Sequence, residues 1–586
     1  MGSQTYPQES DWSSIRIKVF YSIGYYQVLS NETRDILSRA MQLTLDFLAS
    51  AISVQRLKVP LRLNRSEPCL HGKRLLDLNE STFIHGVKNA DLAIIMDASD
   101  AGTCVGDTAT VAHAAPCELH PISGRPIKGR VAICKGKVEQ LGLKVKGSAV
   151  TLLHEMMHVL VFSPDSLFHR FNTPDVRKAA KNVTVLVKWA WKVGNNDSTI
   201  VDTKLVNSPH VLKAVRDYTG CADLEGAQLE NGGTVGTVHS HWEKRIFGPE
   251  LMTGVQSPIA PFSVITAALL QDSGWYLVNN SVIEDLEWGK GLGCKFARQS
   301  CREYMDQRPN VPDGAHPYCN FKDYVLEQSI RLSMLRCSAR RDHVRSCVFK
   351  TSDNITKKHQ VFRGKSERLK DGRNIVGDQV IGDDELADYC PMWKVHQRGV
   401  DKKKETDSVC ADVNNQPKRL DNFAMEIYGP SSKCFEQETV FVKLRCVGAR
   451  ILGRVDYAYE KASGAACYEY KCEMGRLFVR AKGFQRTSTA NAFKVCWAKG
   501  SAIALYRYQK DFNGSTNLYR GSILCPSCEE ICEGANDDFK CGPEVPGIFS
   551  RDPLISPCWS RAFMPRIANN LILTSTLLIV ILSRCV

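Results

Sequence analysis

Residues 147–163 read GSAVTLLHEMMHVLVFS, an apolar stretch in which two histidines stand four positions apart. Residues four apart share one face of an α-helix, so His154 and His158 can bind a single zinc ion. Glu155 follows the first histidine and is placed to accept a proton from the attacking water. The alternative is a core helix whose two histidines are satisfied by hydrogen bonds alone. The side chains expected to bury this helix are Leu152, Leu153, Met156, Val159 and Leu160.

A catalytic zinc ion needs a third protein ligand, since it binds three side chains and leaves one position open. The compact motif HExxHxxGxxH would place a glycine and a histidine where the chain has Val161 and Pro164. No glutamate occurs in residues 156–224, which disfavours a glutamate ligand from a following helix. An aspartate ligand, such as Asp165 or Asp175, stays open, although no spacing favours either residue.

A distant histidine is the remaining source of the third ligand. Residues 236–254 read GTVHSHWEKRIFGPELMTG, in which His241 is followed by a Gly-Pro turn and, eleven residues on, by Met252. A methionine in a tight turn beneath the zinc is a mark of metzincin proteases. His239 lies two residues before His241 and is the rival ligand.

Several blocks of this chain, in order, resemble the leishmanolysin family of metalloproteases, which includes the invadolysin-like proteins. The blocks lie between Ile15 and Cys541 and comprise residues 124–129, 154–163, 220–226, 241–254 and 258–275. The resemblance implies an α+β fold. It predicts a metzincin-like zinc protease catalytic domain with an inserted central domain, followed by a disulfide-rich, mostly β C-terminal domain.

The resemblance also assigns roles by position. The family places its third ligand directly before a tryptophan, which favours His241, before Trp242, over His239. The implied roles are zinc ligand for His154, His158 and His241, general base for Glu155, and Met-turn residue for Met252.

One position departs from the family pattern, because Val161 stands where the family usually has glycine. A β-branched residue with positive φ would cost about 1–2 kcal/mol. The helix is therefore either strained at Val161 or continues to Ser163 and stops before Pro164.

The domain organisation expected from the sequence has four parts. Residues 1–163 form an N-terminal catalytic subdomain, 164–290 a central subdomain with His241 and Met252, 291–560 a cysteine-rich domain, and 561–586 a hydrophobic tail. The elements expected within them are strands at 16–21, 90–96, 439–446 and 502–508 and helices at 33–54 and 175–191. The strand at 92–96 is either an edge that binds substrate as an extra strand or an ordinary interior strand.

Cysteine usage predicts a secretory route and an extracellular or cell-surface location. The chain has 23 cysteines, and without Cys585 the remaining 22 can all pair. Cys525-Pro-Ser-Cys528 lacks a second half at zinc-ribbon spacing, which favours disulfides there. Candidate glycosylation sequons agree with this route: Asn31, Asn64, Asn79, Asn182, Asn196, Asn279, Asn354 and Asn513.

The two ends of the chain give opposite indications. Residues 1–11 have neither the basic nor the apolar region of a signal peptide, so we expect an incomplete N-terminus that lacks a signal and a pro-segment. Residues 571–582 read LILTSTLLIVIL, shorter than the roughly 20 residues of a spanning helix. Small residues before this tail favour a GPI-attachment signal, with a terminal membrane anchor as the alternative.

The motifs together predict a secreted or cell-surface zinc endopeptidase with one zinc ion per chain, acting on proteins or peptides. The alternative is a catalytically inactive surface adhesion or binding protein that retains the fold, for which Val161 is the supporting feature. The net charge of +13 is spread along the chain without any nucleic-acid motif, so no nucleic-acid partner is expected.

Overall fold

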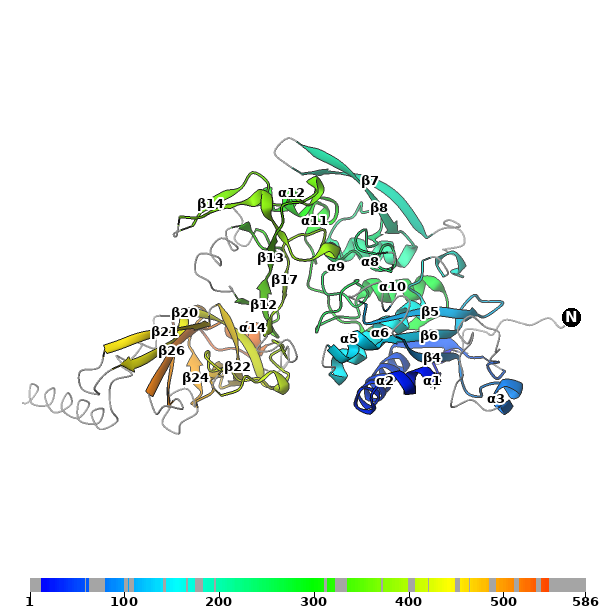
Figure 1. Cartoon of the computed structure of the whole chain (residues 1–586), viewed down its shortest axis with the longest axis horizontal. Coiled ribbons are helices and arrows are strands. Elements are labelled where there is room, and N and C mark those ends of the chain that lie inside the picture. Colours follow the sequence, from blue (N-terminus) through cyan, green and yellow to red (C-terminus); the bar gives the residue numbers. More distant parts are fainter. Residues whose placement is uncertain are drawn as a thin grey trace, which may run out of the picture. The chain divides into compact units, whose positions relative to one another are not determined.

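The computed structural model divides the chain into two compact units, drawn in Figure 1. One unit comprises residues 1–324, 348–393 and 399–405, and the other comprises 325–347, 394–398 and 406–586. The structure describes residues 12–546 apart from 58, 63–79, 100–103, 105–109, 141–143, 165–166, 174–182, 194–196, 235, 310–313, 322–334, 370–371, 399–405, 420, 448–453, 463, 484–491, 511–515 and 534–538. The four-part division expected from the sequence stays a prediction.

A four-stranded sheet organises the beginning of the first unit. Its strands are β2 (Ile17–Tyr21), β4 (Leu92–Ser99), β6 (Pro126–Cys134) and β5 (Ala112–Leu119), in that order across the sheet. The first three are parallel, and β5 runs antiparallel to β6 at the edge. The strands expected at 16–21 and 90–96 are thus confirmed. Residues 92–96, however, are buried in an interior strand and provide no edge, because they pair on both sides.

Two helices pack beside this sheet and position the motif of residues 147–163. Helix α6 (Val145–Leu160) contacts β5, β6 and α2 (Asn31–Ala51), and Thr44 of α2 donates a hydrogen bond to the Ala149 carbonyl of α6. Helix α6 approaches β6 closely at Gly129, where an added Cβ would overlap the side chain of Val159. The helix expected at 33–54 ends earlier than expected, because strand β3 begins at Ile52 and pairs with two other strands.

The central part of the first unit contains a β-hairpin where a helix is expected. Strands β7 (Thr184–Lys192) and β8 (Ser198–Val206) pair antiparallel, and β9 (Ala227–Gln228) extends the sheet. The helix prediction for 175–191 is therefore wrong from Thr184 onward. Trp189 and Trp191 are buried while Lys188 and Ala190 are exposed, and this period of two is that of a strand.

Two further helices of this unit are joined by a buried carboxylate. Helix α8 (Pro209–Thr219) begins beside Asp272 of α10 (Val264–Ser273). Asp272 accepts hydrogen bonds from the backbone N–H groups of His210 and Val211 and from Ser208 Oγ. The carboxylate therefore satisfies N–H groups that a helix N-terminus leaves unpaired.

The second unit is a β-rich module with disulfides. Its seven-stranded sheet has the order β24 (Lys494–Cys496), β23 (Arg476–Arg480), β22 (Ala465–Glu473), β20 (Ser432–Val447), β26 (Thr516–Leu524) and β25 (Ala502–Lys510), with β21 (Arg454–Ala462) also paired to β20. The strands expected at 439–446 and 502–508 are confirmed as parts of β20 and β25. A core of apolar side chains, including Phe435, Tyr468 and Ile523, lies under this sheet.

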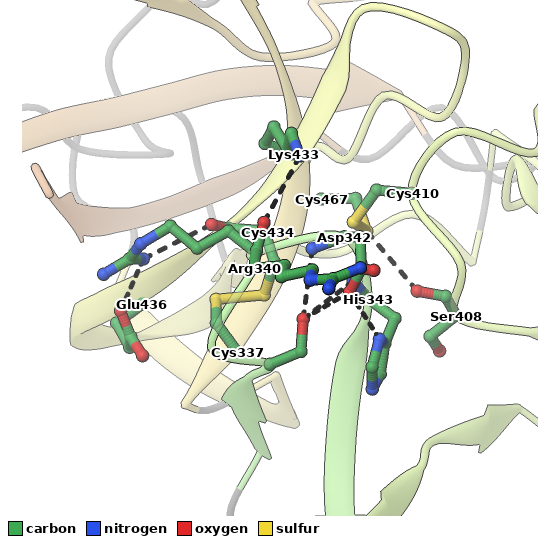
Figure 2. Close-up of a disulfide and its surroundings, with 12 residues drawn as sticks. Cys337, Arg340, Asp342, His343, Ser408, Cys410, Lys433, Cys434, Glu436 and Cys467 are labelled. Atoms are coloured by element: carbon green, nitrogen blue, oxygen red, sulfur yellow. Dashed lines mark hydrogen bonds and ion pairs between the residues drawn. A yellow bond between two sulfur atoms is a disulfide. The ribbon is translucent and has the colours of Figure 1, made fainter. Parts of the chain in front are cut away.

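Disulfides link segments that are distant in the sequence. In Figure 2, Cys337–Cys434 and Cys410–Cys467 lie close together around Asp342 and His343, whose side chains are 2.7 Å apart. Cys525 and Cys528 each form a disulfide with another cysteine, which confirms the prediction of disulfides at these two positions. The other bonds described are Cys104–Cys134, Cys221–Cys294, Cys301–Cys390, Cys472–Cys532, Cys496–Cys525 and Cys528–Cys541.

Only some of the predicted glycosylation sites lie within the described residues. Asn31, Asn279 and Asn354 are exposed, whereas the other five sequons, at 64, 79, 182, 196 and 513, lie outside the described residues. The apolar tail at 571–582 lies outside them too. Within the part of the chain that is described, no helix has the length and apolar character needed to cross a membrane.

Candidate metal centre

Helix α6 carries His154, Glu155 and His158, and it ends two residues after His158, at Leu160. The backbone N–H of Val161 donates to the Met157 carbonyl, and the φ of Val161 is −151°. Both outcomes expected for this position, positive φ and continuation of the helix to Ser163, are wrong. Val161 therefore ends the helix without a left-handed residue, and its ψ of −33° lies outside the extended region.

The third histidine is held by backbone hydrogen bonds on both sides. The His241 carbonyl accepts from Glu230 N–H at 2.9 Å, and Trp242 N–H donates to the Met252 carbonyl at 2.9 Å. The Trp242 side chain is fully buried and donates through Nε1 to Thr266 Oγ1. These contacts place His241 over α6, although it follows His158 by 83 residues.

The three imidazoles converge through their Nε2 atoms. The separation is 3.1 Å between His154 and either partner, and 3.2 Å between His158 and His241. Nitrogens at about 2.1 Å from a tetrahedral zinc ion would be about 3.4 Å apart, close to these distances. No other set of three imidazoles converges among the residues that the structure describes.

The opposite ring nitrogens determine which tautomer each histidine adopts. His154 Nδ1 lies 2.7 Å from the Leu251 carbonyl, and His158 Nδ1 lies 2.8 Å from the Phe162 carbonyl. His241 Nδ1 lies 3.3 Å from the Thr237 carbonyl. A carbonyl oxygen can only accept, so Nδ1 of His154 and of His158 carries the proton and their Nε2 atoms present lone pairs to the centre. His241 Nδ1 also lies 3.1 Å from Ser240 Oγ, which can either donate or accept. Three Nε2 atoms that face one another fit a cation between them when each presents its lone pair.

Burial favours the same protonation state. Burial lowers the pKa of His158 to about 3, with help from the neighbouring His154, and burial also lowers the pKa values of His154 and His241. The neutral imidazole is the form that binds metal. The residues present therefore fit a zinc ion, in both geometry and donor chemistry.

Glu155 lies beside this cluster without the partners that a buried carboxylate usually has. Its side chain is 5% exposed, and Oε2 has no hydrogen-bond partner among the described residues. Burial raises the pKa of Glu155 to about 8. A buried carboxyl oxygen without a hydrogen-bond partner is costly unless a cation or a polar ligand lies near it, which makes this position a candidate functional site.

Met252 lies in a turn that a second glutamate organises. The Met252 side chain is fully buried, and its backbone N–H donates to Glu250 Oε2. Glu250 Oε1 also accepts from Ser263 Oγ at 2.7 Å and from Thr266 Oγ1 at 2.6 Å. The turn therefore holds the Leu251 carbonyl, the acceptor for His154, in a fixed place.

The chain is similar to known proteins over most of its length. The model of the leishmanolysin family matches residues 19–538, which is most of the chain. The chain belongs to the leishmanolysin family. It is similar to the leishmanolysin-like peptidase of Caenorhabditis elegans, with 30% identity over 505 residues that cover 81% of this chain and 70% of the relative. The Drosophila melanogaster leishmanolysin-like peptidase is 30% identical over 497 residues, covering 80% and 68%. A leishmanolysin homolog of Crithidia fasciculata is 28% identical over 268 residues, covering 46% and 35%.

The leishmanolysin family is a family of zinc metallopeptidases, so the chain is a member of a metal-dependent peptidase family. The structure brings together His154, Glu155, His158 and His241. His239 is separate from the cluster and has a left-handed backbone, with φ of 61°. The open alternatives Asp165 and Asp175 lie outside the described residues.

The acids that hold the loops around the three histidines in place were not predicted from the sequence. Glu250 and Glu230 are buried acids that bind backbone N–H groups of the loops around the site. The signal was weak, because a single acid in a loop is usually a solvated residue. Two other groupings of metal-ligand residues contain Cys221, Cys294 and Cys541, which are oxidised in disulfides and offer no thiolate.

Proposed function

We propose that this chain is a zinc endopeptidase in which His154, His158 and His241 bind one zinc ion and Glu155 is the general base. The convergence of three imidazole Nε2 atoms, next to a buried glutamate whose Oε2 has no partner among the described residues, carries this proposal. Family membership supports it, because the family consists of zinc metallopeptidases. The endopeptidase specificity, the single zinc ion and the metzincin-like layout are part of the proposal.

The bound zinc would polarise the scissile carbonyl and make the attacking water more acidic. Glu155 would take the proton of that water through its unpaired Oε2 and return the proton to the leaving amine. The Leu251, Phe162 and Thr237 carbonyls would keep the imidazoles from rotating during this cycle. Met252 would form the floor of the site without any part in proton transfer.

The edge of the four-stranded sheet supports a binding mode for an extended peptide. Strand β5 (Ala112–Leu119) is half-buried, packs beside α6 and pairs with β6 on one side. An edge strand has unpaired backbone N–H and C=O groups that an added strand can use. In the proposed enzyme, β5 rather than β4 would therefore bind the substrate backbone.

A catalytically inactive adhesion protein would need a defect at the site. Val161 was the sequence feature that favoured this alternative, and its φ of −151° is not the positive φ that would have strained a β-branched residue there. We therefore propose the active enzyme. The disulfides support a secreted or cell-surface location, which we propose with it. Attachment through a GPI anchor or terminal helix, and glycosylation at the exposed sequons, are also proposals.

The deciding experiment measures zinc content and cleavage of a denatured protein substrate by the purified full chain. We expect one zinc ion per chain, loss of cleavage on addition of a chelator, and recovery when zinc is restored. Zinc without cleavage would favour the adhesion protein. A folded chain that binds no zinc would contradict the proposed ligand set.

A further inference from the structure

A short turn far along the chain packs against both loops of the metal centre. The turn Asp384–Asp388 contains the 3₁₀ segment Glu385–Ala387 and belongs to the same unit as His241. A Cβ built on Gly254, two residues after Met252, would lie 2.7 Å from Leu386 Cδ1 and 3.7 Å from His241 Cγ. The Leu386 side chain therefore contacts the Met-turn loop at a point that the third histidine also reaches.

Leu386 also contacts the loop that precedes His241. A Cβ built on Gly233 would lie 2.7 Å from Leu386 Cδ2, and Gly233 has a φ of 84°. One on Gly232 would lie 3.2 Å from the Glu385 carbonyl. The side chain of Leu386 thus occupies space that the glycines of two separate loops leave open. The leucine is 9% exposed, and these two loops contribute to its burial.

Two buried ion pairs attach the same turn to the residues that follow His241. Lys244 Nζ lies 2.9 Å from Asp384 Oδ2, and both side chains are 9% exposed. Arg245 Nε lies 3.2 Å from Asp388 Oδ2, and these side chains are 0% and 4% exposed. Removal of one partner from a buried pair leaves an uncompensated charge, so each pair holds its two segments together.

Arg245 extends this attachment to other parts of the unit. Its guanidinium donates to Gln228 Oε1 and to the Gln299 carbonyl and lies over the ring of Trp191. Its carbonyl accepts from Trp288 Nε1 at 3.2 Å. Arg245 follows His241 by four residues, so a shift of the turn at Asp388 would be transmitted directly to the ligand loop.

The backbone of the turn is held in an uncommon conformation. Asp388 and Tyr389 are consecutive left-handed residues, with φ of 51° and 54°. Side chains with a Cβ avoid this region unless the surrounding contacts require it. Cys390, the next residue, forms a disulfide with Cys301. The turn is therefore held by an ion pair at each end and by a disulfide two residues after it.

We propose that the turn Asp384–Asp388 is a brace for the metal centre, in which Leu386, Asp384 and Asp388 are positioning residues for His241 and the Met-turn. The zinc-binding part rests on the proposed function. The structural part of the proposal does not depend on zinc, because it concerns only how firmly the loops around His241 and Met252 are held.

The test compares Leu386→Ala and Asp388→Asn with Leu369→Ala in the full chain. Leu369 is a buried leucine of the same 348–393 segment, so its truncation controls for a general loss of packing. Zinc affinity is measured by competition with a chelator, and the absorption spectrum of the cobalt-substituted protein reports the ligand set. We expect the brace variants to bind zinc about 10-fold to 100-fold more weakly and to alter the cobalt spectrum. The control should stay within about twofold of the parent, even where its thermal stability falls equally.

Hydrogen exchange separates the brace from the proposed function. The backbone N–H groups of His239 and Trp242 are bonded to Glu230 and Met252, and we expect them to exchange faster in the two brace variants than in the control, with or without zinc. Unchanged exchange and unchanged zinc affinity in Leu386→Ala would overturn the brace. Equal weakening in Leu369→Ala would also overturn it. A parent that binds no zinc, yet shows the faster exchange on Leu386→Ala, would overturn the proposed function and leave the brace supported.

Discussion

At the scale of single residues, Glu155 differs from the other buried acids around the site. Glu250 and Glu230 accept hydrogen bonds from backbone N–H groups, whereas Glu155 Oε2 has no partner among the described residues. Glu155→Gln keeps the shape of the side chain and removes its basicity. We expect zinc content to be unchanged and cleavage to fall by about 100-fold to 10,000-fold. Zinc analysis and initial rates on a denatured protein measure both quantities. Glu32→Gln, at an exposed position, is the control. Full activity of Glu155→Gln would show that another group is the base.

The two histidines at positions 239 and 241 form a natural pair for a second prediction. His241 Nε2 faces the other imidazoles, whereas His239 is separate from them. We expect His241→Gln to lose bound zinc and cleavage, because two histidines leave the centre one ligand short. His239→Gln should keep zinc within about twofold. Equilibrium dialysis against zinc measures this difference, and the reverse pattern would identify His239 as the ligand.

At the scale of helices and strands, the approach of α6 to the sheet depends on Gly129. A Cβ at this position would overlap Val159, which is fully buried on α6 one residue after His158. We expect Gly129→Ala to destabilise the unit by about 1–3 kcal/mol. Val159→Ala in the same chain should recover part of that loss, because it removes the overlapping methyl groups. Thermal unfolding of the single and double variants measures the coupling, and strictly additive losses would contradict direct contact.

At the scale of the whole molecule, disulfides of different loop length should contribute unequally to stability. Cys337–Cys434 joins residues 97 apart, whereas Cys528–Cys541 joins residues 13 apart. Loop-closure entropy predicts losses of about 4–5 kcal/mol and about 3 kcal/mol when each pair is replaced by serines. Chemical denaturation of the full chain compares the variants. Both bonds lie in the second unit, so zinc content should stay unchanged. A larger loss for the short loop would contradict the entropic account.

Local patterns in the sequence were sufficient for several elements. The apolar spacing around His154 predicted helix α6, and runs of β-branched and aromatic residues predicted the strands that became β2, β20 and β25. The helix prediction failed at Thr184–Lys192, although Val185, Val187, Trp189 and Trp191 recur there with the period of two that is typical of a strand. The period-two burial of Trp189 and Trp191 appears only when β8 pairs beside them.

The sequence by itself determined the chemistry of the site, because the residue types and the four-residue spacing of His154 and His158 are local properties of one helix. It also named His241 through its family resemblance. The tertiary structure alone decided how these side chains are held. The Leu251 carbonyl lies 97 residues from His154, and Asp388 lies 143 residues from Arg245. Contacts at such separations depend on how the chain packs as a whole, and no local pattern encodes them.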